Sequence, residues 1–333
     1  MVLTPHLPTL GMNVIVAGAS GRLGRRVLEA LKRQRIPCTG LVRSKEAAAG
    51  LPKGAKGRVV DYKDLDSLRA ALADATHLVN CTGLVSDSAS DDELMIANAL
   101  ITRHLLEACP KTLVRFVQLS SISVYGFDPP AKANEFSPRN PDTPYGRSKL
   151  EGERIAVEWA HRLPITILQP GMIYGPGFRE GFWPMLDKLK KGGVRIIGDG
   201  QNVLPLVHVE DVVGGVLAAL RAKVPSGSIF LLVHPQVVTQ REAMMGAAHA
   251  IKAVPPKESI PMGAAMLMSR AHHAISRLRG HTPSMSHDML RQLSSNRSFD
   301  VHRAMSSMRW RPAISFKEGL AQVIKEYKKS NKR

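Results

Sequence analysis

The sequence predicts an α/β fold, in which a doubly wound parallel sheet is joined to a smaller, mostly helical lobe. Short runs rich in Val, Ile and Leu recur through the first 170 residues without polar alternation, as in strands covered on both faces. Segments with helical periodicity separate these runs, which is typical of a parallel sheet. Glycines at 18, 21 and 24 follow the first run and precede the first helical segment.

The expected elements alternate in order through this first part of the chain. Buried strands are expected at 13–19, 38–42, 57–61, 77–81, 113–120 and 165–171 because these runs are short and apolar. Helices are expected at 22–34, 64–73, 91–109 and 146–162, where the apolar residues recur at helical spacing.

After residue 171 the alternation breaks. Pro and Gly cluster in 169–184, and helical stretches then dominate, with short strands near 194–197, 204–207 and 228–233. We expect a nucleotide-binding domain over 12–174, to which the chain returns near 204–232 and 312–328. The smaller substrate-binding lobe is expected over 175–203 and 233–311.

Composition limits the class of protein. The 333 residues are 44% hydrophobic, which suits a globular chain, and no apolar run is long enough to span a bilayer. The first twelve residues do not form a convincing secretory signal. Cys38, Cys81 and Cys109 are scattered in or beside apolar runs, which indicates buried, reduced thiols and a cytoplasmic location.

The net charge of +18 is uneven along the chain. Residues 241–333 contain 17 Lys and Arg against 6 Asp and Glu. Such an excess favours anionic partners, which could be a phosphorylated ligand or an acidic membrane surface in peripheral contact. A solvated basic surface is the alternative. No zinc finger or aromatic RNA-binding signature is present, so no specific nucleic-acid partner is expected.

The glycine loop predicts a dinucleotide site. Gly18 permits the tight turn, Gly21 lets the backbone approach a pyrophosphate, and Gly24 lets the helix pack closely on the strand. The N-terminus of the following helix offers free N–H groups and a partial positive charge to the phosphates.

The end of the second strand discriminates between cofactors. An acid there would accept from the ribose 2′-hydroxyl of NAD, but this strand ends in Arg43, and Arg22 in the glycine loop could point the same way. A guanidinium suits a 2′-phosphate, so NADP is expected and NAD is the less favoured cofactor. Asp61 ends the third strand, where it either accepts from the adenine amino group or begins the next helix.

A second set of polar residues lies further along the chain. Tyr145 and Lys149 are one helical turn apart in TPYGRSKLEGER, and Ser120 and Ser121 end the fifth strand, at the edge where ligands of parallel sheets bind. A lysine and a positive nicotinamide ring would lower the pKa of the phenol and make it an effective acid–base group. The alternative is an exposed surface pair.

With these motifs the chain resembles the extended short-chain dehydrogenase/reductases, also called the NAD-dependent epimerase/dehydratase family, over about residues 12–325. The motifs are G-x-x-G-x-x-G at 18–24, NALITRHLLEAC at 98–109, SSISVYG at 120–126, Y-x-x-x-K at 145–149, QPGMIYGPG at 169–177, LVHVEDVVGGVLAAL at 206–220 and MRWRPAISFKEGL at 308–320. Each is weak alone, and seven in this order are specific.

The resemblance implies a Rossmann domain and a role for each site residue. Tyr145 would move the proton on the substrate oxygen, Lys149 would hold the nicotinamide ribose and lower the pKa of Tyr145, Ser121 would bind the reacting oxygen, and Asn98 would support the site. The cofactor contacts it implies are Gly18, Ser20, Gly21, Arg22, Leu23, Gly24, Arg43, Asp61, Tyr62, Thr82, Gly83, Tyr145, Lys149, Pro170, Gly171, Met172 and Ile173. The substrate contacts are Ser121, Phe178, Phe182, Trp183 and His208.

Three functions remain open from the sequence. Sugar dehydratases of the family carry an acid pair after the strand-end serine, where this chain has Ile122 and Ser123, so dehydration is not expected. The order of motifs resembles the 3β-hydroxysteroid and sterol-carboxylate dehydrogenase branch. This favours an NAD(P)-dependent enzyme that interconverts a secondary alcohol and a ketone on a hydrophobic, sterol-like or prenyl-like small molecule. The alternatives are a nucleotide-sugar epimerase and a nucleotide-binding assembly subunit without turnover.

The second lobe and the histidines add two further expectations. An apolar helix around Met262 to Leu278 carries arginines at its sides, which fits a core-facing helix, a hydrophobic substrate pocket or a membrane contact. Adjacent His272 and His273 would point in different directions on a helix, so no metal site is expected. The resemblance implies a homodimer formed through two helices of the first domain.

Overall fold

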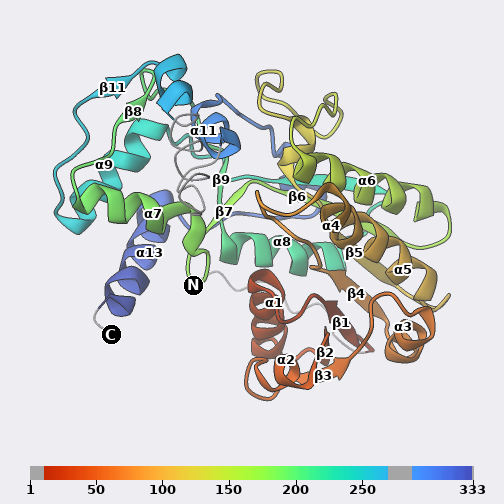
Figure 1. Cartoon of the computed structure of the whole chain (residues 1–333). Helices are drawn as coiled ribbons and strands as arrows, with labels where there is room; N and C mark the ends of the chain where they lie inside the picture. Colours follow the sequence, from red (N-terminus) through yellow and green to blue (C-terminus); the bar gives the residue numbers. More distant parts are fainter. Residues whose placement is uncertain (1–10, 269–286, 332–333) are drawn as a thin grey trace.

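The computed structural model describes residues 11–268 and 287–331, and a seven-stranded parallel sheet lies at its centre (Figure 1). The strands lie in the order β10–β6–β5–β4–β1–β2–β3. Their bounds are β1 Val14–Ala17, β2 Cys38–Val42, β3 Lys56–Val59, β4 His77–Asn80, β5 Arg115–Leu119, β6 Ile165–Pro170 and β10 Ser228–Leu232. These strands coincide with the expected runs, and the doubly wound α/β class is confirmed.

Helices cover both faces of the sheet, which explains the unbroken apolar strands. Val14 and Val16 of β1 point into one core, and Ile15 and Ala17 point into the other, because successive side chains of a strand face opposite sides. The first core is closed by α1 (Arg22–Arg33) and α8 (Val209–Arg221). The second is closed by α3 (Leu65–Leu72), α5 (Ile101–Ala108) and α6 (Pro144–Glu158).

The order of the strands reverses beside β1. The chain passes from β1 to β2 on one side and later returns to β4 on the other. Ligands of open α/β sheets bind at the carboxyl ends of the strands at such a reversal. Gly18 and Cys81, which follow β1 and β4, therefore lie next to each other at this edge, and a side chain on Gly18 would collide with the Cys81 backbone.

The expected helix 91–109 forms with a widened turn in its middle. It consists of α4 (Asp91–Met95), a π-helical segment η1 (Ile96–Leu100) and α5. Ser90 begins α4 with a capping box, in which its hydroxyl accepts from Glu93 N and the Glu93 carboxylate accepts from Ser90 N. π-helical turns are frequent at functional sites, and this one contains Asn98.

The second lobe has a core of its own, on the left in Figure 1. Helices α7 (Arg179–Lys190), α9 (Gln240–Ile251) and α13 (Phe316–Ser330) pack around it. Strand β7 (Met172–Tyr174) pairs with β9 (Leu206–His208), and β8 (Ile196–Ile197) pairs with β11 (Ser259–Ile260). The shorter elements of the chain are α2 (Lys45–Ala49), the 3₁₀ helices η2 (Ile122–Tyr125) and η3 (Trp159–His161), α11 (His287–Ser294) and α12 (His302–Ser307).

Two C-terminal segments lie against the opposite core from the one that the sequence suggested. Helix α12 packs on β10, and Met308 and Trp310 belong to the first domain's core, although 233–311 was assigned to the lobe. Helix α13 packs on α9 with Leu320 and Tyr327 in the lobe core, although 312–328 was assigned to the first domain. The amphipathic pattern of a helix shows that one side is buried but does not name the surface that covers it.

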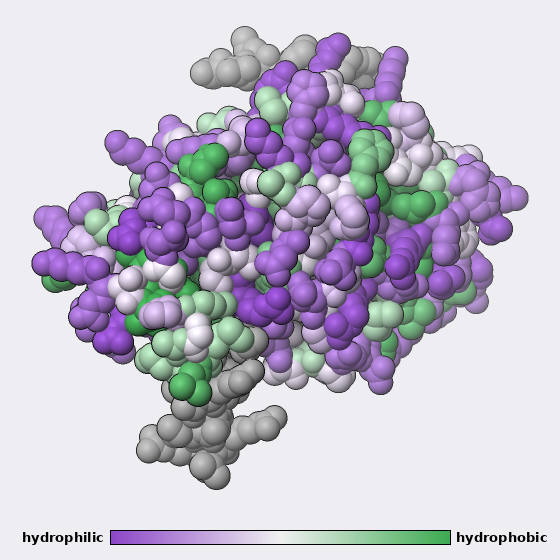
Figure 2. Space-filling view, turned by 90° about the horizontal axis from the view of Figure 1, so that it is seen from above, coloured by the Kyte–Doolittle hydropathy of each residue, from purple (hydrophilic) through white to green (hydrophobic). Residues whose placement is uncertain are grey.

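None of the helices in residues 11–268 and 287–331 combines the length and apolar character needed to cross a bilayer. On the face shown in Figure 2, hydrophilic residues predominate and hydrophobic ones form small scattered areas. A helix begins at 262, but most of the expected Met262–Leu278 segment, with His272 and His273, lies outside the described residues. The membrane contact therefore stays a prediction.

Candidate active site

The glycine loop has the geometry that a pyrophosphate requires. Gly18 has φ +70°, and a Cβ on it would lie 2.8 Å from the carbonyl carbon of Cys81. A Cβ on Gly24 would overlap the carbonyl oxygen of Gly18. Gly21 begins α1 without a side-chain cap, and no acid lies in the first turn. The first N–H groups of α1 therefore remain free of a side-chain acceptor, and the loop fits the phosphates of a dinucleotide.

Tyr62 supports this loop from below. Its hydroxyl accepts from Gly18 N at 2.9 Å and donates to the carbonyl oxygen of Leu41 at 3.1 Å. The side chain is buried, and burial raises the pKa of the phenol to about 12. The sequence placed Tyr62 among the cofactor contacts. In the structure its hydroxyl instead joins the ends of β1 and β2 beneath the site.

The residues expected near the adenosine ribose differ in the contacts that their side chains make. Arg43 is exposed directly after β2. Arg22 instead forms an ion pair with Glu180 of α7 and stacks on the Phe178 ring, with its guanidinium carbon 5.1 Å from the ring centre. Asp61 is exposed and accepts from Lys63 N at 2.9 Å, which orders the turn before α3. The contact of Arg43 with a 2′-phosphate stays a prediction.

Ser121, Tyr145 and Lys149 come together at the carboxyl ends of the parallel strands. Ser121 follows β5 and caps η2, and its hydroxyl accepts from Ser123 N at 3.1 Å. Tyr145 lies in the first turn of α6, which Thr143 caps by accepting from Gly146 N at 3.0 Å. Hydrogen bonding with Ser121 acts on the Tyr145 phenol and lowers its pKa, which places the two hydroxyls together.

Burial shifts the pKa values of this set in opposite directions. It raises the pKa of the Tyr145 phenol above its ordinary value, and the bond with Ser121 offsets only part of the shift. It lowers the pKa of Lys149 to about 8, against the charge of Glu153. The ammonium of Lys149 donates to the Leu119 carbonyl. In the protein alone, burial therefore outweighs the hydrogen bond that lowers the Tyr145 pKa. The effect of Lys149 and of a bound nicotinamide on this pKa stays a prediction.

Asn98 braces the loop that follows β4. Its Oδ1 accepts from Leu84 N at 3.0 Å, and its Nδ2 donates to the Leu84 carbonyl at 3.0 Å and to Ser148 Oγ at 2.9 Å. A Cβ on Gly83, which has φ +156°, would lie 2.7 Å from Asn98 Oδ1. Thr82 is fixed by two hydrogen bonds to Asn80 Oδ1. Asn98 therefore ties this loop to α6, as a supporting residue would.

The segment 170–173 crosses from the sheet to the second lobe. Pro170 ends β6, and Gly171 packs so closely against Pro205 that a side chain would overlap the Pro205 carbonyl. Met172 and Ile173 follow in β7, which pairs with β9. The sulfur of Met172 lies 3.7 Å from a guanidinium nitrogen of Arg297.

Comparison with known proteins places the chain in a family. The model of the NAD dependent epimerase/dehydratase family matches residues 14–232. The chain belongs to this family. An Escherichia coli O157:H7 protein named N-acetyl-alpha-D-glucosaminyl-diphospho-ditrans,octacis-undecaprenol 4-epimerase is 24% identical over 302 residues, which cover 89% of each chain. Sterol demethylase protein B of Methylococcus capsulatus is 28% identical over 308 residues, which cover 88% of this chain and 92% of that protein.

The fold agrees with the same family. The crystal structure of UDP-glucuronic acid 4-epimerase from Bacillus cereus in complex with NAD superposes with a TM-score of 0.76 at 20% identity, covering 96% of this chain and 99% of that one. The protein is therefore an NAD(P)-dependent enzyme of the epimerase/dehydratase family with a Rossmann-type sheet.

Three of the expected substrate contacts pack in or beside the core of the second lobe. Phe182 is buried 5.6 Å from the Tyr174 ring, and Trp183 packs edge-on against Tyr327 at 5.4 Å. His208 is fully buried, its Nδ1 accepts from Glu210 N, and burial lowers its pKa to about 4. Phe182 and Trp183 pack inward on α7, and His208 is buried at the end of β9. Their assignment to the substrate cleft stays a prediction. Phe178 is half-buried beneath Arg22.

Sequence reasoning missed two buried charged residues near the site. Glu153 is 3% exposed and lies one turn beyond Lys149, so the spacing of charges at 149 and 153 was an available signal. Arg297 is 1% exposed, and its Nε has no hydrogen-bond partner among the described residues. It lies in a polar stretch that gave no sign of burial. Among the described residues, no group of three or more His, Cys, Asp or Glu side chains could hold a metal ion.

Proposed function

We propose that the protein is an NAD(P)-dependent oxidoreductase that interconverts a secondary alcohol and a ketone on a hydrophobic substrate. The observation that carries this proposal is the convergence of Ser121 and Tyr145 at the sheet edge that also holds the glycine loop. When bound, the nicotinamide donates or accepts the hydride. In reduction the Tyr145 hydroxyl gives its proton to the carbonyl oxygen, which becomes the alcohol, and in oxidation it takes that proton back. Ser121 donates a hydrogen bond to the same oxygen.

The side chains after Ser121 support oxidoreduction rather than dehydration. Ile122 is buried at 2% exposure, and Ser123 bonds to Ser121 at 3.1 Å. Neither can act as the acid or base that expels water from a sugar ring. The names of both curated relatives include a lipid, undecaprenol in one and sterol in the other, which favours a substrate with a large apolar part.

Epimerisation is the second candidate, and two relatives favour it. The 4-epimerase from Escherichia coli and the UDP-glucuronic acid 4-epimerase are named for a reaction at a sugar hydroxyl. The same Tyr145 and Ser121 pair would serve such a reaction, in which the hydride is removed and then returned to the opposite face. The basic charge of the chain would suit the diphosphate of such a substrate.

The test is incubation of the purified protein with NADPH or NADH and two substrate panels. Hydroxysteroids, prenyl ketones and their reduced forms make up the first panel, and nucleotide and polyprenyl-diphosphate sugars make up the second. Net change in the reduced nicotinamide absorbance with the first panel supports the oxidoreductase. Formation of an epimer without net change in the cofactor would contradict the oxidoreductase proposal and support the epimerase. Cofactor binding without any turnover would favour the assembly subunit.

We also propose NADP as the preferred cofactor, because the cation Arg43 is exposed directly after β2. The Bacillus cereus epimerase, which has NAD in its crystal structure, supports the alternative. The guanidinium fork of Arg43 would hold the 2′-phosphate oxygens, and NAD has no such group. The preference can be measured separately from the substrate, by comparing the dissociation constants of the two reduced cofactors.

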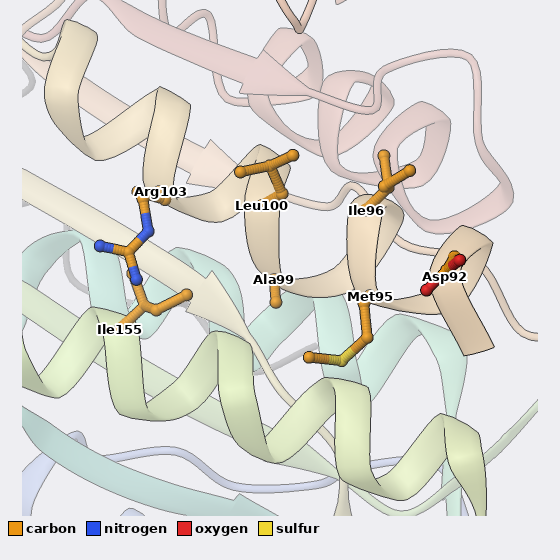
Figure 3. A pocket seen from close by; sticks show the side chains of 7 residues that line it. All are labelled: Asp92, Met95, Ile96, Ala99, Leu100, Arg103 and Ile155. Atoms are coloured by element: carbon orange, nitrogen blue, oxygen red, sulfur yellow. The ribbon is translucent and has the colours of Figure 1, made fainter.

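We propose a homodimer through the outer side of α4, η1 and α5, where Met95, Leu100 and Arg103 border a shallow hollow closed by Ile155 of α6 (Figure 3). Met95 is 39% and Leu100 is 38% exposed, so this surface has apolar area left to bury. Sedimentation should show a dimer that Leu100→Glu dissociates. Val114→Glu, at a 56% exposed apolar position elsewhere, is the control and should leave the dimer intact. A monomeric wild type contradicts the proposal.

A further inference from the structure

Three hydrogen-bond donors converge on the buried carboxylate of Glu153. Ser120 Oγ donates to Oε2 at 2.7 Å, and Gln169 Nε2 donates to the same oxygen at 2.8 Å. Arg139 Nε donates to Oε1 at 3.2 Å. Every partner is a donor, so the group that fits here is an ionised acceptor with two oxygens. A glutamine would turn an N–H₂ group toward at least one of these donors.

The Glu153 carboxylate joins the ends of β5 and β6 to α6, the helix that carries Tyr145 and Lys149. Ser120 follows β5, Gln169 lies near the end of β6, and Glu153 lies on α6 one turn after Lys149. The network extends further, because Tyr125 donates to Gln169 Oε1 at 2.7 Å and the Arg139 guanidinium lies over the Tyr125 ring at 5.3 Å. A network whose members are all satisfied fixes the relative position of its elements.

We propose that Glu153 is a positioning residue, which keeps the Lys149 side chain charged and aligned on the end of β5 by anchoring α6 to Ser120 and Gln169. This inference rests on the proposed function, in which Tyr145, one helical turn before Lys149 on α6, transfers the proton. Lys149 is 5% exposed and its ammonium donates to the Leu119 carbonyl, in the residue before Ser120. Lys149 and Glu153 are therefore both hydrogen-bonded to residues at the end of β5.

Among the described residues around Lys149, Glu153 supplies the negative charge that acts on the ammonium. Cys81, which follows β4, also lies near Lys149, but burial raises the pKa of this thiol to about 12 and keeps it neutral. Tyr145 lies on the same helix, and its pKa is raised as well. Arg139 also forms an ion pair with Glu153, and its positive charge weakens the effect of the Glu153 carboxylate on Lys149. Burial lowers the pKa of Lys149 to about 8, and the charge of Glu153 opposes this shift.

Two substitutions should therefore move the ionisation of Lys149 in opposite directions. Glu153→Gln removes the anion, so the proton affinity of Lys149 should fall by about tenfold, a change of about one pH unit in its midpoint. Arg139→Gln removes the competing cation and leaves the anion, so the midpoint should rise. Glu151→Gln is the matched control, because Glu151 lies on the same helix but is half-exposed and forms an ion pair with Arg154 at 3.7 Å.

The experiment is a titration of the Lys149 ε-carbon signal by NMR in protein labelled with ¹³C at that position of lysine, with Lys149→Arg identifying the signal. It needs no substrate, so a protein without turnover defeats the proposed function and leaves this measurement intact. A folded Glu153→Gln variant with an unchanged Lys149 midpoint overturns the inference. If that variant does not fold, Arg139→Gln decides alone, and a midpoint that stays or falls overturns it. In an active enzyme, the alkaline limb of kcat/KM should move with each midpoint.

Discussion

The hydroxyl of Tyr62 accepts a hydrogen bond from the backbone N–H of Gly18 at 2.9 Å, and this contact fixes the first glycine of the phosphate loop. Removing the hydroxyl leaves the Gly18 N–H without this acceptor in a buried place, whereas the Leu41 carbonyl still accepts from Ala19 N at 3.3 Å. Each such group costs about 1–3 kcal/mol when it is left unsatisfied.

We therefore expect Tyr62→Phe to weaken NAD(P)H binding about tenfold and to lower the free energy of unfolding by about 1–3 kcal/mol. Fluorescence titration of the reduced cofactor and urea unfolding measure the two effects. Tyr327→Phe is the control, because this hydroxyl bonds to Asp187 within the second lobe. It should change stability without changing the dissociation constant of the cofactor. Unaltered cofactor binding in Tyr62→Phe would show that the loop does not need this support.

Tyr145→Phe should lower turnover by about 10²–10⁴-fold, the usual contribution of a positioned acid or base. The ring remains and only the proton-transferring hydroxyl is lost, so the dissociation constant of NAD(P)H should stay nearly constant. Steady-state kinetics with the substrate found in the panels, together with cofactor titration, provide the comparison. Turnover that survives the substitution would remove Tyr145 from its proposed role.

Arg43→Ala should weaken NADPH binding by about 10–100-fold, because a hydrogen bond to a charged group contributes about 1.5–3 kcal/mol. NADH binding should change little. Arg22→Ala is the comparison, since Arg22 forms an exposed ion pair with Glu180, and such pairs contribute about 0–1 kcal/mol. Equal losses for NADPH and NADH in Arg43→Ala would refute the 2′-phosphate contact.

Lys149→Met should stabilise the fold near neutral pH, because it removes a charge that burial disfavours, while it should abolish turnover. The pKa of Lys149 is about 8 in the folded protein, below its ordinary value. The unfolded chain therefore binds more protons than the native state between pH 8 and about 10.4. The lysine's cost to stability is full below pH 8 and shrinks as the pH rises through this window.

The measurement for Lys149 is the difference in unfolding free energy between wild type and Lys149→Met at several pH values. Using the difference cancels the other groups that titrate in the same range. The gain of the variant should be largest at neutral pH and should decline above pH 8. A gain that is independent of pH would show that Lys149 does not titrate in this window.

The sequence by itself determined the sheet, the glycine loop and the family. Unbroken runs such as 14–17 and 165–170 could be assigned as strands because burial on both faces leaves no polar alternation. Gly18 and Gly24 could be recognised because only glycine tolerates the backbone contacts made there. These signals are local, since each residue's own conformation or burial accounts for them.

Only the tertiary structure decided which surfaces and charges meet. The periodicity of α12 and α13 did not reveal that the first packs on β10 and the second on α9. The sequence does not show whether Phe182 faces a ligand or a core, because an aromatic residue beside a glycine-rich segment can do either; in the structure it packs against Tyr174. The buried network of Glu153 and the direction of the Tyr145 pKa shift depend on distances between groups far apart in the chain. Desolvation and charge pairing act through space, so no local pattern records them.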